Sequence, residues 1–374
     1  MANMIEYLKW RGDLSFDAAA FNDVDNLLLA QIVYLELDKI VPKPGSPMEI
    51  TLEAAVEEYF KTHDEAWQKK AGHMEQAAII TAKEMVKTRR FKDISLFAYM
   101  NEISTDEESQ FCVMQIRTGD GCLYVSFSGT DNTIVGWKEN FNMSFLEQTP
   151  GQKKAVQYMN TYISGDESTI RVGGHSKGGN LSVYASVYCE PHIQEKILRV
   201  YNNDGPGFNK IVLEDEKYHR MLPKILTILP ESSIVGMLMQ HEETYEVVAS
   251  SEKPIYQHDP LSWLVMGSSF VRVETLAKGS LLLDTKLKSW ISGMLPEERE
   301  EFVEVIFDIL DEAHITTAEE LKQMNLKTVI DLVRTGSRFD KENQKILSKT
   351  LRKLWSEINS PKKQGSDSKH TKIT

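Results

Sequence analysis

Residues 170–182 read IRVGGHSKGGNLS, and within them Gly174 to Gly178 form a G-x-S-x-G motif around Ser176. A short β-type run precedes the motif, and apolar residues at helical spacing follow it. In a nucleophile elbow a strand turns sharply into a helix, so the serine takes a strained backbone conformation and glycines must flank it. Ordinary turns also match the motif, but the preceding strand and following helix are the context that an elbow requires. We therefore expect Ser176 at the tip of an elbow, with Gly174 and Gly178 at its crowded positions.

Composition and charge limit the classes of protein to which the chain can belong. Of its 374 residues, 41% are hydrophobic and 26% are charged, as in soluble globular proteins. No apolar run approaches the roughly 20 residues that span a bilayer. Residues 1–13 lack an apolar h-region, so we expect no secretory signal there. The formal net charge of −12 argues against nucleic acid or an anionic membrane as the main partner. Three cysteines without metal-type spacing predict a reduced, cytoplasmic protein. The serine chemistry expected at Ser176 needs no metal or organic cofactor.

The order of periodic segments indicates an α/β fold. Helical spacing of apolar residues predicts helices over about 22–35, 51–61, 74–88 and 156–163. Apolar runs bounded by turn residues predict strands over 111–116, 123–127, 197–201, 225–229 and 245–249. Because strands alternate with helices, we expect a mainly parallel central sheet. The chain would then comprise an N-terminal helical extension packed on the core (1–90), an α/β core (91–275), a C-terminal helical region (276–359) and a disordered tail (360–374).

Ser176 needs a histidine base, because a serine hydroxyl is a poor nucleophile at its own pKa. In hydrolases with this elbow the chain order is serine, acid and histidine, each on a loop after a strand. Three histidines remain after those at the end of the elbow helix, in the C-terminal helical region and in the tail are set aside (His192, His314 and His370). His219 lies in a charged segment, His241 precedes two acids at the start of a strand, and His258 follows the last strand in a loop bounded by prolines. We favour His258 as the base; the alternative for it is an ordinary loop histidine.

Two carboxylates remain open as the group that orients the base. Asp204 ends the strand after the motif, in a Gly-Pro-Gly turn whose tight backbone would hold it rigidly. Glu231 ends the following strand, which is the more usual position of the acid in this kind of fold. An Asx-turn role for Asp204 and a surface position for Glu231 are the structural alternatives. We favour Asp204 by a small margin.

Two hydrogen-bond donors are expected for the oxyanion that forms when a serine attacks a carbonyl group. The amide of Lys177 would lie at the start of the helix after Ser176 and point at the developing charge. Thr130 follows the strand over 123–127 and offers both an amide and a hydroxyl. The alternative for Thr130 is a turn threonine that caps the next segment.

These motifs resemble those of class 3 lipases and, more closely, of a bacterial group of lipase-like α/β-hydrolases of unassigned function, the Mbeg-like group. Residues 125–130, with Ile134 and Trp137 downstream, are similar to the F-R-G-[ST] oxyanion segment, with Ser128 in place of the arginine. Residues 170–179 are similar to the lipase signature, from which Gly173 and Lys177 depart.

The resemblance implies an α/β-hydrolase core, with Ser176 as nucleophile and the amides of Thr130 and Lys177 as oxyanion donors. It is specific over residues 111–207. In class 3 lipases the acid follows the next strand, where this chain has Glu231 followed by two serines. The N-terminal hundred residues and the C-terminal helices resemble the Mbeg-like group alone, and they imply no activity.

The sequence therefore predicts a serine hydrolase that cleaves a carboxylic ester of a lipid or of an acylated small molecule through an acyl-enzyme on Ser176. A catalytically silent α/β-hydrolase scaffold, whose added helices bind a partner protein, is the alternative. Acyl transfer to an acceptor other than water is a third possibility. The substrate class depends on the resemblance, because the fold does not determine the function.

Overall fold

A nine-stranded sheet organises the part of the chain that the structure describes. The structure is a computed structural model, and it describes residues 2–104, 106, 109–130, 143, 146–163, 169–253 and 256–277. The strand order is β1-β2-β3-β4-β5-β6-β7-β8-β11, and β9 and β10 form a separate hairpin. The strands are β1 (Ile50–Thr51), β2 (Ser95–Ser104), β3 (Ser109–Arg117), β4 (Leu123–Phe127), β5 (Ile170–His175), β6 (Ile197–Asn203), β7 (Ile225–Pro230), β8 (Tyr245–Val248), β9 (Val265–Met266), β10 (Ser269–Phe270) and β11 (Arg272–Val273).

Helices lie between β1 and β2 and between the consecutive strands from β4 to β7, and they cover both faces of the sheet. The α-helices are α1 (Met4–Arg11), α2 (Asp23–Ile32), α3 (Leu52–Thr62), α4 (Glu65–Gln68), α5 (His73–Met85), α7 (Pro150–Tyr162), α8 (Lys177–Tyr188), α9 (Pro191–Lys196), α10 (Lys210–Leu213) and α11 (Glu216–Met221). Short 3-10 turns lie at Leu222–Lys224 and Pro260–Ser262. Within the described residues, the structure contains no helix of the length and apolarity that crossing a membrane requires.

The sheet is mixed, and its parallel part lies at the centre. Strands β4 to β8 pair in parallel, whereas β1 to β4 and the β8–β11 pair are antiparallel. Short connections join β2 to β3 and β3 to β4, as antiparallel neighbours allow, whereas helices form the crossovers between the parallel strands β4 to β7. The prediction of a mainly parallel sheet therefore holds for β4 to β8, at the centre of the sheet. The sequence patterns did not indicate β1, β2 or β11.

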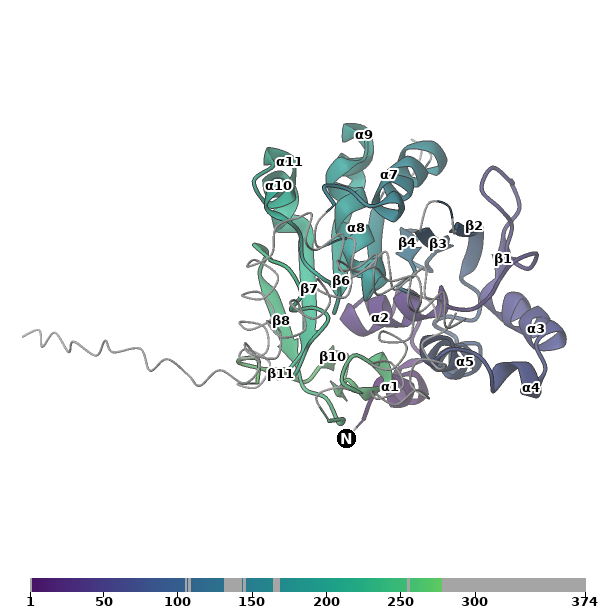
Figure 1. The fold of residues 1–374 in the computed structure, drawn as a ribbon. Helices are drawn as coiled ribbons and strands as arrows, with labels where there is room; N and C mark the ends of the chain where they lie inside the picture. The colour runs from purple at the N-terminus through teal and green to yellow at the C-terminus, as the bar shows by residue number, and fades with distance from the viewer. Residues whose placement is uncertain are drawn as a thin grey trace, which may run out of the picture.

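The two faces of the sheet are covered by different helices. Along β3 and β4 the side chains alternate, so that Val113 and Val125 pack with residues of α7, α8 and α11, whereas Met114 and Tyr124 pack with residues of α1, α2 and α5. Both strands are buried on both faces. Figure 1 shows α7 to α11 together on one side of the sheet and α1, α2 and α5 on the other.

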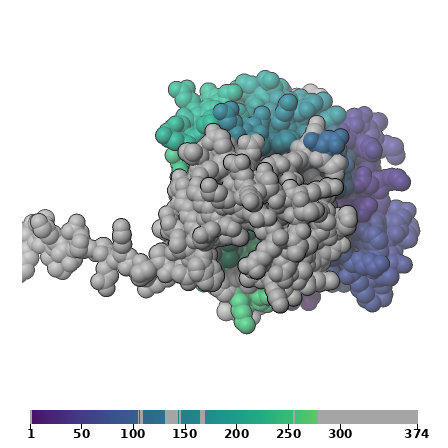
Figure 2. All heavy atoms as spheres, viewed as in Figure 1, coloured from purple at the N-terminus to yellow at the C-terminus, as the bar shows by residue number. Residues whose placement is uncertain are grey.

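The N-terminal segment, which we define as residues 2–90, is built into this arrangement. It contributes the edge strand β1 as well as the helices of one face. In the space-filling view, its purple and blue residues form one side of the molecule, next to the teal residues of the sheet and its helices (Figure 2). Its first residues also reach far along the chain, since Val265 N–H donates to Ala2 O at 2.8 Å and Asn3 Nδ2 donates to Leu261 O at 2.8 Å.

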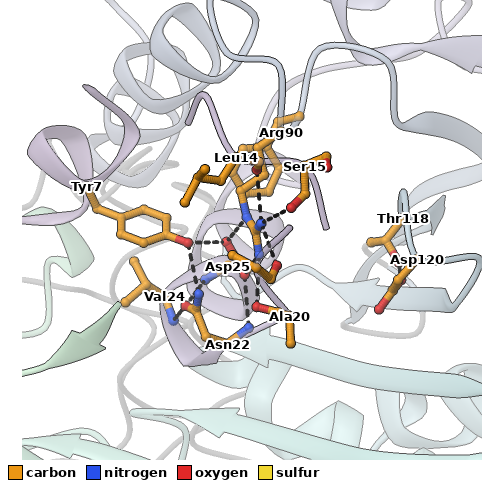
Figure 3. A network of polar contacts seen from close by, with 12 residues as sticks. Tyr7, Leu14, Ser15, Ala20, Asn22, Val24, Asp25, Arg90, Thr118 and Asp120 are labelled. Atoms are coloured by element: carbon orange, nitrogen blue, oxygen red, sulfur yellow. Dashed lines mark hydrogen bonds and ion pairs between the residues drawn. The ribbon is translucent and has the colours of Figure 1, made fainter. Parts of the chain in front are cut away.

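Helix α2 is held in place by a buried ion pair at its first turn. Arg90 Nη2 lies 2.5 Å from Asp25 Oδ2, and Arg90 Nε donates to Asp25 Oδ1 at 2.9 Å. Tyr7 Oη donates to the same carboxylate at 2.7 Å (Figure 3). The guanidinium also donates to four backbone carbonyls, those of Leu14, Ser15, Ala19 and Ala20. Because every charged group is paired, this buried cluster fixes the loop before α2 as well as the helix itself.

The predicted helices of the N-terminal segment are observed. Asn22 caps α2 through a capping box with Asp25, and Thr51 caps α3. The predicted C-terminal helical region and tail lie outside the described residues, apart from residues 276 and 277. Ile134 and Trp137 lie outside them as well.

Candidate active site

Ser176 lies at the turn between β5 and α8, at the carboxyl edge of the parallel strands. Its backbone has φ +58° and ψ −133°, a conformation that residues with a side chain rarely adopt. The Ser176 N–H donates to Asn203 O at 2.9 Å, which fixes the turn to the end of β6. A Cβ atom on Gly174 would lie 2.3 Å from the carbonyl carbon of Gly178, and one on Gly178 would lie 2.1 Å from Phe127 O. A side chain at either position would collide with backbone atoms, so both positions require glycine.

The structure brings Ser176, His258 and Asp204 together in one line. Ser176 Oγ lies 3.0 Å from His258 Nε2, and His258 Nδ1 lies 2.7 Å from Asp204 Oδ2. Asp204 is fully buried, whereas the His258 side chain is 25% exposed. Hydroxyl, imidazole and carboxylate thus have the contacts of a nucleophile, its base and the group that orients the base.

The carboxylate in this line is that of Asp204 and not that of Glu231. The Glu231 N–H donates to Val248 O at 2.8 Å, which continues the pairing of β7 with β8. No hydrogen bond or ion pair between Glu231 and His258 is found among the described residues. Ser233, two residues after Glu231, instead donates its hydroxyl to Asp204 Oδ1 at 2.5 Å.

Asp204 is held by several hydrogen bonds that the sequence did not indicate. Besides Ser233, the Gly236 N–H donates to Asp204 Oδ1 at 3.1 Å, and the Asp204 N–H donates to Ile228 O at 2.9 Å. Asp204 has φ +49°, which aspartate tolerates better than most residues. One carboxylate oxygen is thereby fixed by the 233–236 loop, and the other remains directed at His258.

A second buried cluster supports the 233–236 loop. His241 Nε2 lies 2.7 Å from Gly236 O, and His241 Nδ1 lies 2.8 Å from Glu243 Oε1. Because both ring nitrogens face acceptors, both bonds form when the ring carries two protons. Burial alone would raise the pKa of Glu243, but hydrogen bonds from His241, Thr227 and Tyr218 and the charge of His241 lower it to about 2. His241 thus lies in a supporting cluster.

The remaining candidate base also lies away from Ser176. His219 Nε2 is 2.7 Å from Leu213 O and 3.4 Å from Glu242 Oε2, and its side chain is half-exposed. Both alternatives to His258 therefore have partners other than Ser176.

The segment 128–130 lies directly against the elbow. A Cβ atom on Gly129 would lie 2.6 Å from His175 O and 3.0 Å from Ser176 Cβ, so the backbone of this segment passes beside the serine. Thr130 follows it, and the Lys177 amide opens α8 after Ser176. The Lys177 side chain is buried and donates to the main-chain and side-chain oxygens of Gln110. Lys177 would therefore contribute its backbone N–H, and not its side chain, to an oxyanion site.

Helix α2 supports the elbow from the opposite face of the sheet. Asn203 Nδ2 donates to Gly174 O at 2.9 Å, and Asn26 Nδ2 donates to Asn203 Oδ1 at 2.9 Å. Tyr124 Oη donates to Asn26 Oδ1 at 2.7 Å. A Cβ atom on Gly173 would lie 2.0 Å from Tyr124 Oη, which accounts for a glycine where the lipase signature has another residue. These polar contacts are distant in sequence, and no local pattern indicates them.

Among the described residues, no group of three or more histidine, cysteine, aspartate or glutamate side chains could hold a metal ion. A family model described as Mbeg1-like matches residues 85–308. A comparison with curated proteins finds no match. A crystal structure of M37 lipase is similar over 47% of this chain and 70% of that chain, with 17% sequence identity and a TM-score of 0.34.

Proposed function

The chain belongs to the Mbeg1-like family. We propose that it is a serine hydrolase of the α/β-hydrolase type that cleaves a carboxylic ester. The observation that carries this proposal is the continuous line from Ser176 Oγ through His258 to the buried carboxylate of Asp204. The strained backbone of Ser176 supports it, since such strain is concentrated at functional sites.

In the first half of the reaction, Ser176 Oγ attacks the ester carbonyl while His258 Nε2 takes the hydroxyl proton. Asp204 holds the proton on His258 Nδ1, which leaves Nε2 free to act as the base, and its negative charge stabilises the imidazolium that forms. The amides of Lys177 and Thr130 are the proposed donors to the oxyanion. When the tetrahedral intermediate collapses, the imidazolium gives its proton to the leaving alcohol and the acyl group stays on Ser176.

In the second half, a water molecule gives a proton to His258 and attacks the acyl-enzyme. The same oxyanion donors act again, and collapse of the second intermediate returns the proton to Ser176 Oγ and releases the carboxylic acid. An alcohol in place of the water would give acyl transfer by identical steps. The three described cysteines are buried and free, which supports a reducing cytoplasm as the place of action.

Labelling by a fluorophosphonate probe tests this proposal. We expect the wild-type protein to be labelled, and Ser176→Ala and His258→Ala to lose labelling while they remain folded by circular dichroism and urea unfolding. His219→Ala is the matched control, because it removes a histidine that has no contact with Ser176, and we expect it to be labelled at the wild-type rate. A folded wild-type protein that is not labelled would refute the proposal and favour a silent scaffold.

A further inference from the structure

His175, the residue before the proposed nucleophile, is fully buried and bridges two segments of the site. Its Nε2 lies 2.9 Å from the backbone carbonyl of His258, and the two imidazole rings are 4.6 Å apart. On its other side, Nδ1 lies 3.3 Å from the hydroxyl of Tyr34, just after α2. The same hydroxyl lies 3.1 Å from His175 O and accepts the N–H of Gly129. The order of contacts is therefore Gly129, Tyr34, His175 and His258.

The acceptors around His175 determine where its proton lies. The His258 carbonyl can only accept, so His175 Nε2 must carry a hydrogen. Burial and the neighbouring His258 ring lower the pKa of His175 well below its ordinary value, so the ring is neutral and Nδ1 presents a lone pair. Burial raises the pKa of Tyr34, so its hydroxyl keeps its single proton. That proton faces two acceptors of the same residue, His175 O at 3.1 Å and the lone pair of His175 Nδ1 at 3.3 Å, so either bond ties Tyr34 to His175.

We propose that Tyr34 and His175 are positioning residues for the reaction, which together set the distance between the oxyanion segment, the elbow and the backbone of the base. This inference rests on the proposed function. Three separate segments must meet to within a fraction of an ångström for Ser176, His258 and the oxyanion donors to act together, and a misplacement of 1 Å can cost about 100-fold in rate. The Tyr34–His175 series joins those three segments directly.

The proposal gives the N-terminal segment a role in the chemistry. Tyr34 and Asn26 lie before residue 85, where the family match begins, yet both contact the elbow or the residues beneath it. A Cβ atom on Gly129 would lie 2.0 Å from Tyr34 Oη, so the tyrosine and the glycine are matched in space. The catalytic unit therefore extends beyond the matched residues to the turn after α2.

The test compares the rate constants of fluorophosphonate labelling in four variants. In His175→Gln the amide nitrogen can still donate to the His258 carbonyl, so we expect a rate within about tenfold of wild type, whereas His175→Leu should be slower by about 100-fold or more. Tyr34→Phe should be slower by about tenfold. Tyr158→Phe is the matched control, because it removes a buried hydroxyl that donates to Ala98 O on the other face of the sheet, and its rate should stay within about twofold of wild type.

Rescue by glutamine but not by leucine is the result that a purely structural role does not predict. Equal labelling rates in wild type, His175→Leu and Tyr34→Phe would overturn the inference while leaving the proposed function intact. Absence of labelling in the wild type would overturn both. Nitrogen-15 spectra of labelled histidine give a second readout, since a His175 ring that carries its proton on Nδ1, or on both nitrogens, at pH 7 would contradict the inference directly.

Discussion

Replacement of Asp204 by asparagine should lower the rate of ester cleavage by about 10⁴-fold with little change in the fold. The asparagine has nearly the same shape, and its oxygen can still accept the hydroxyl of Ser233 and the N–H of Gly236. Its amide nitrogen would then face His258 Nδ1, which must become an acceptor. The proton of the neutral imidazole moves to Nε2, so the ring no longer offers a lone pair to the hydroxyl of Ser176.

The magnitude follows from what each state of the enzyme loses. The resting enzyme loses the correct form of the base, and the transition state loses the negative charge 2.7 Å from the imidazolium. A 10⁴-fold decrease corresponds to about 5.5 kcal/mol of transition-state stabilisation, at about 1.4 kcal/mol for each factor of ten. The assay is kcat/KM on a chromogenic ester at pH 8, with the fluorophosphonate labelling rate as a second measure and urea unfolding as a check on the fold.

Glu231→Gln is the matched control, because it makes the same chemical change at the carboxylate that sequence reasoning kept as the alternative. We expect its kcat/KM to stay within about twofold of wild type, the range of an ordinary surface substitution. A folded Asp204→Asn protein that keeps more than a tenth of the wild-type rate, or a larger loss in Glu231→Gln, would refute the assignment of the acid.

Three further predictions concern stability. Arg90→Met leaves the carboxylate of Asp25 buried and unpaired, so unfolding in urea should show a loss of about 3–5 kcal/mol, and a loss below about 1 kcal/mol would contradict the role of this pair. The pKa of Glu243, lowered from 4.5 to about 2, stabilises the folded state above pH 4.5, and this contribution is lost as the pH falls through both values. Wild type should therefore lose about 2 kcal/mol more than Glu243→Gln between pH 6 and pH 3, and parallel curves would refute the prediction. Gly174→Ala places a Cβ atom 2.3–2.5 Å from three backbone atoms, so it should cost about 3 kcal/mol or more and abolish labelling. Gly119→Ala is its control, because the added Cβ atom meets a single side chain, the ring of Phe16, at 3.0 Å, and this substitution should cost less than Gly174→Ala by about 2 kcal/mol or more.

The parts of the fold that could be predicted are those with a local signal. The G-x-S-x-G motif, the flanking strand and helix, and the capped helices α2 and α3 depend on neighbouring residues, and they are observed. Strand β2 could not be predicted in the same way, because Ala98 has φ +49° and the register shifts between Phe97 and Met100. That irregularity breaks the alternation by which a strand is recognised.

The same distinction holds in the candidate site. Chain order and position after strands indicated Ser176, His258 and Asp204, and the structure brings these three together. Tyr34 could not be predicted, since its contact with His175 arises only when distant segments pack, and the contact of Ser233 with Asp204 was not predicted either. The two serines after Glu231 were a signal, because a hydroxyl at the end of a strand can reach the residue that ends the neighbouring strand.

The link between Ala2 and Val265 has a consequence for how the protein is made. The N-terminal segment leaves the ribosome long before Val265 of the β9–β10 hairpin, which is synthesised more than 250 residues later. At about 5–20 residues per second, it waits for roughly 13–50 seconds before that partner exists. During this time the surface that buries α1 and α2 is incomplete, because their cluster includes Trp263, Val265 and Phe270. Contacts between such distant residues also make folding slow, because the loop between them must close first.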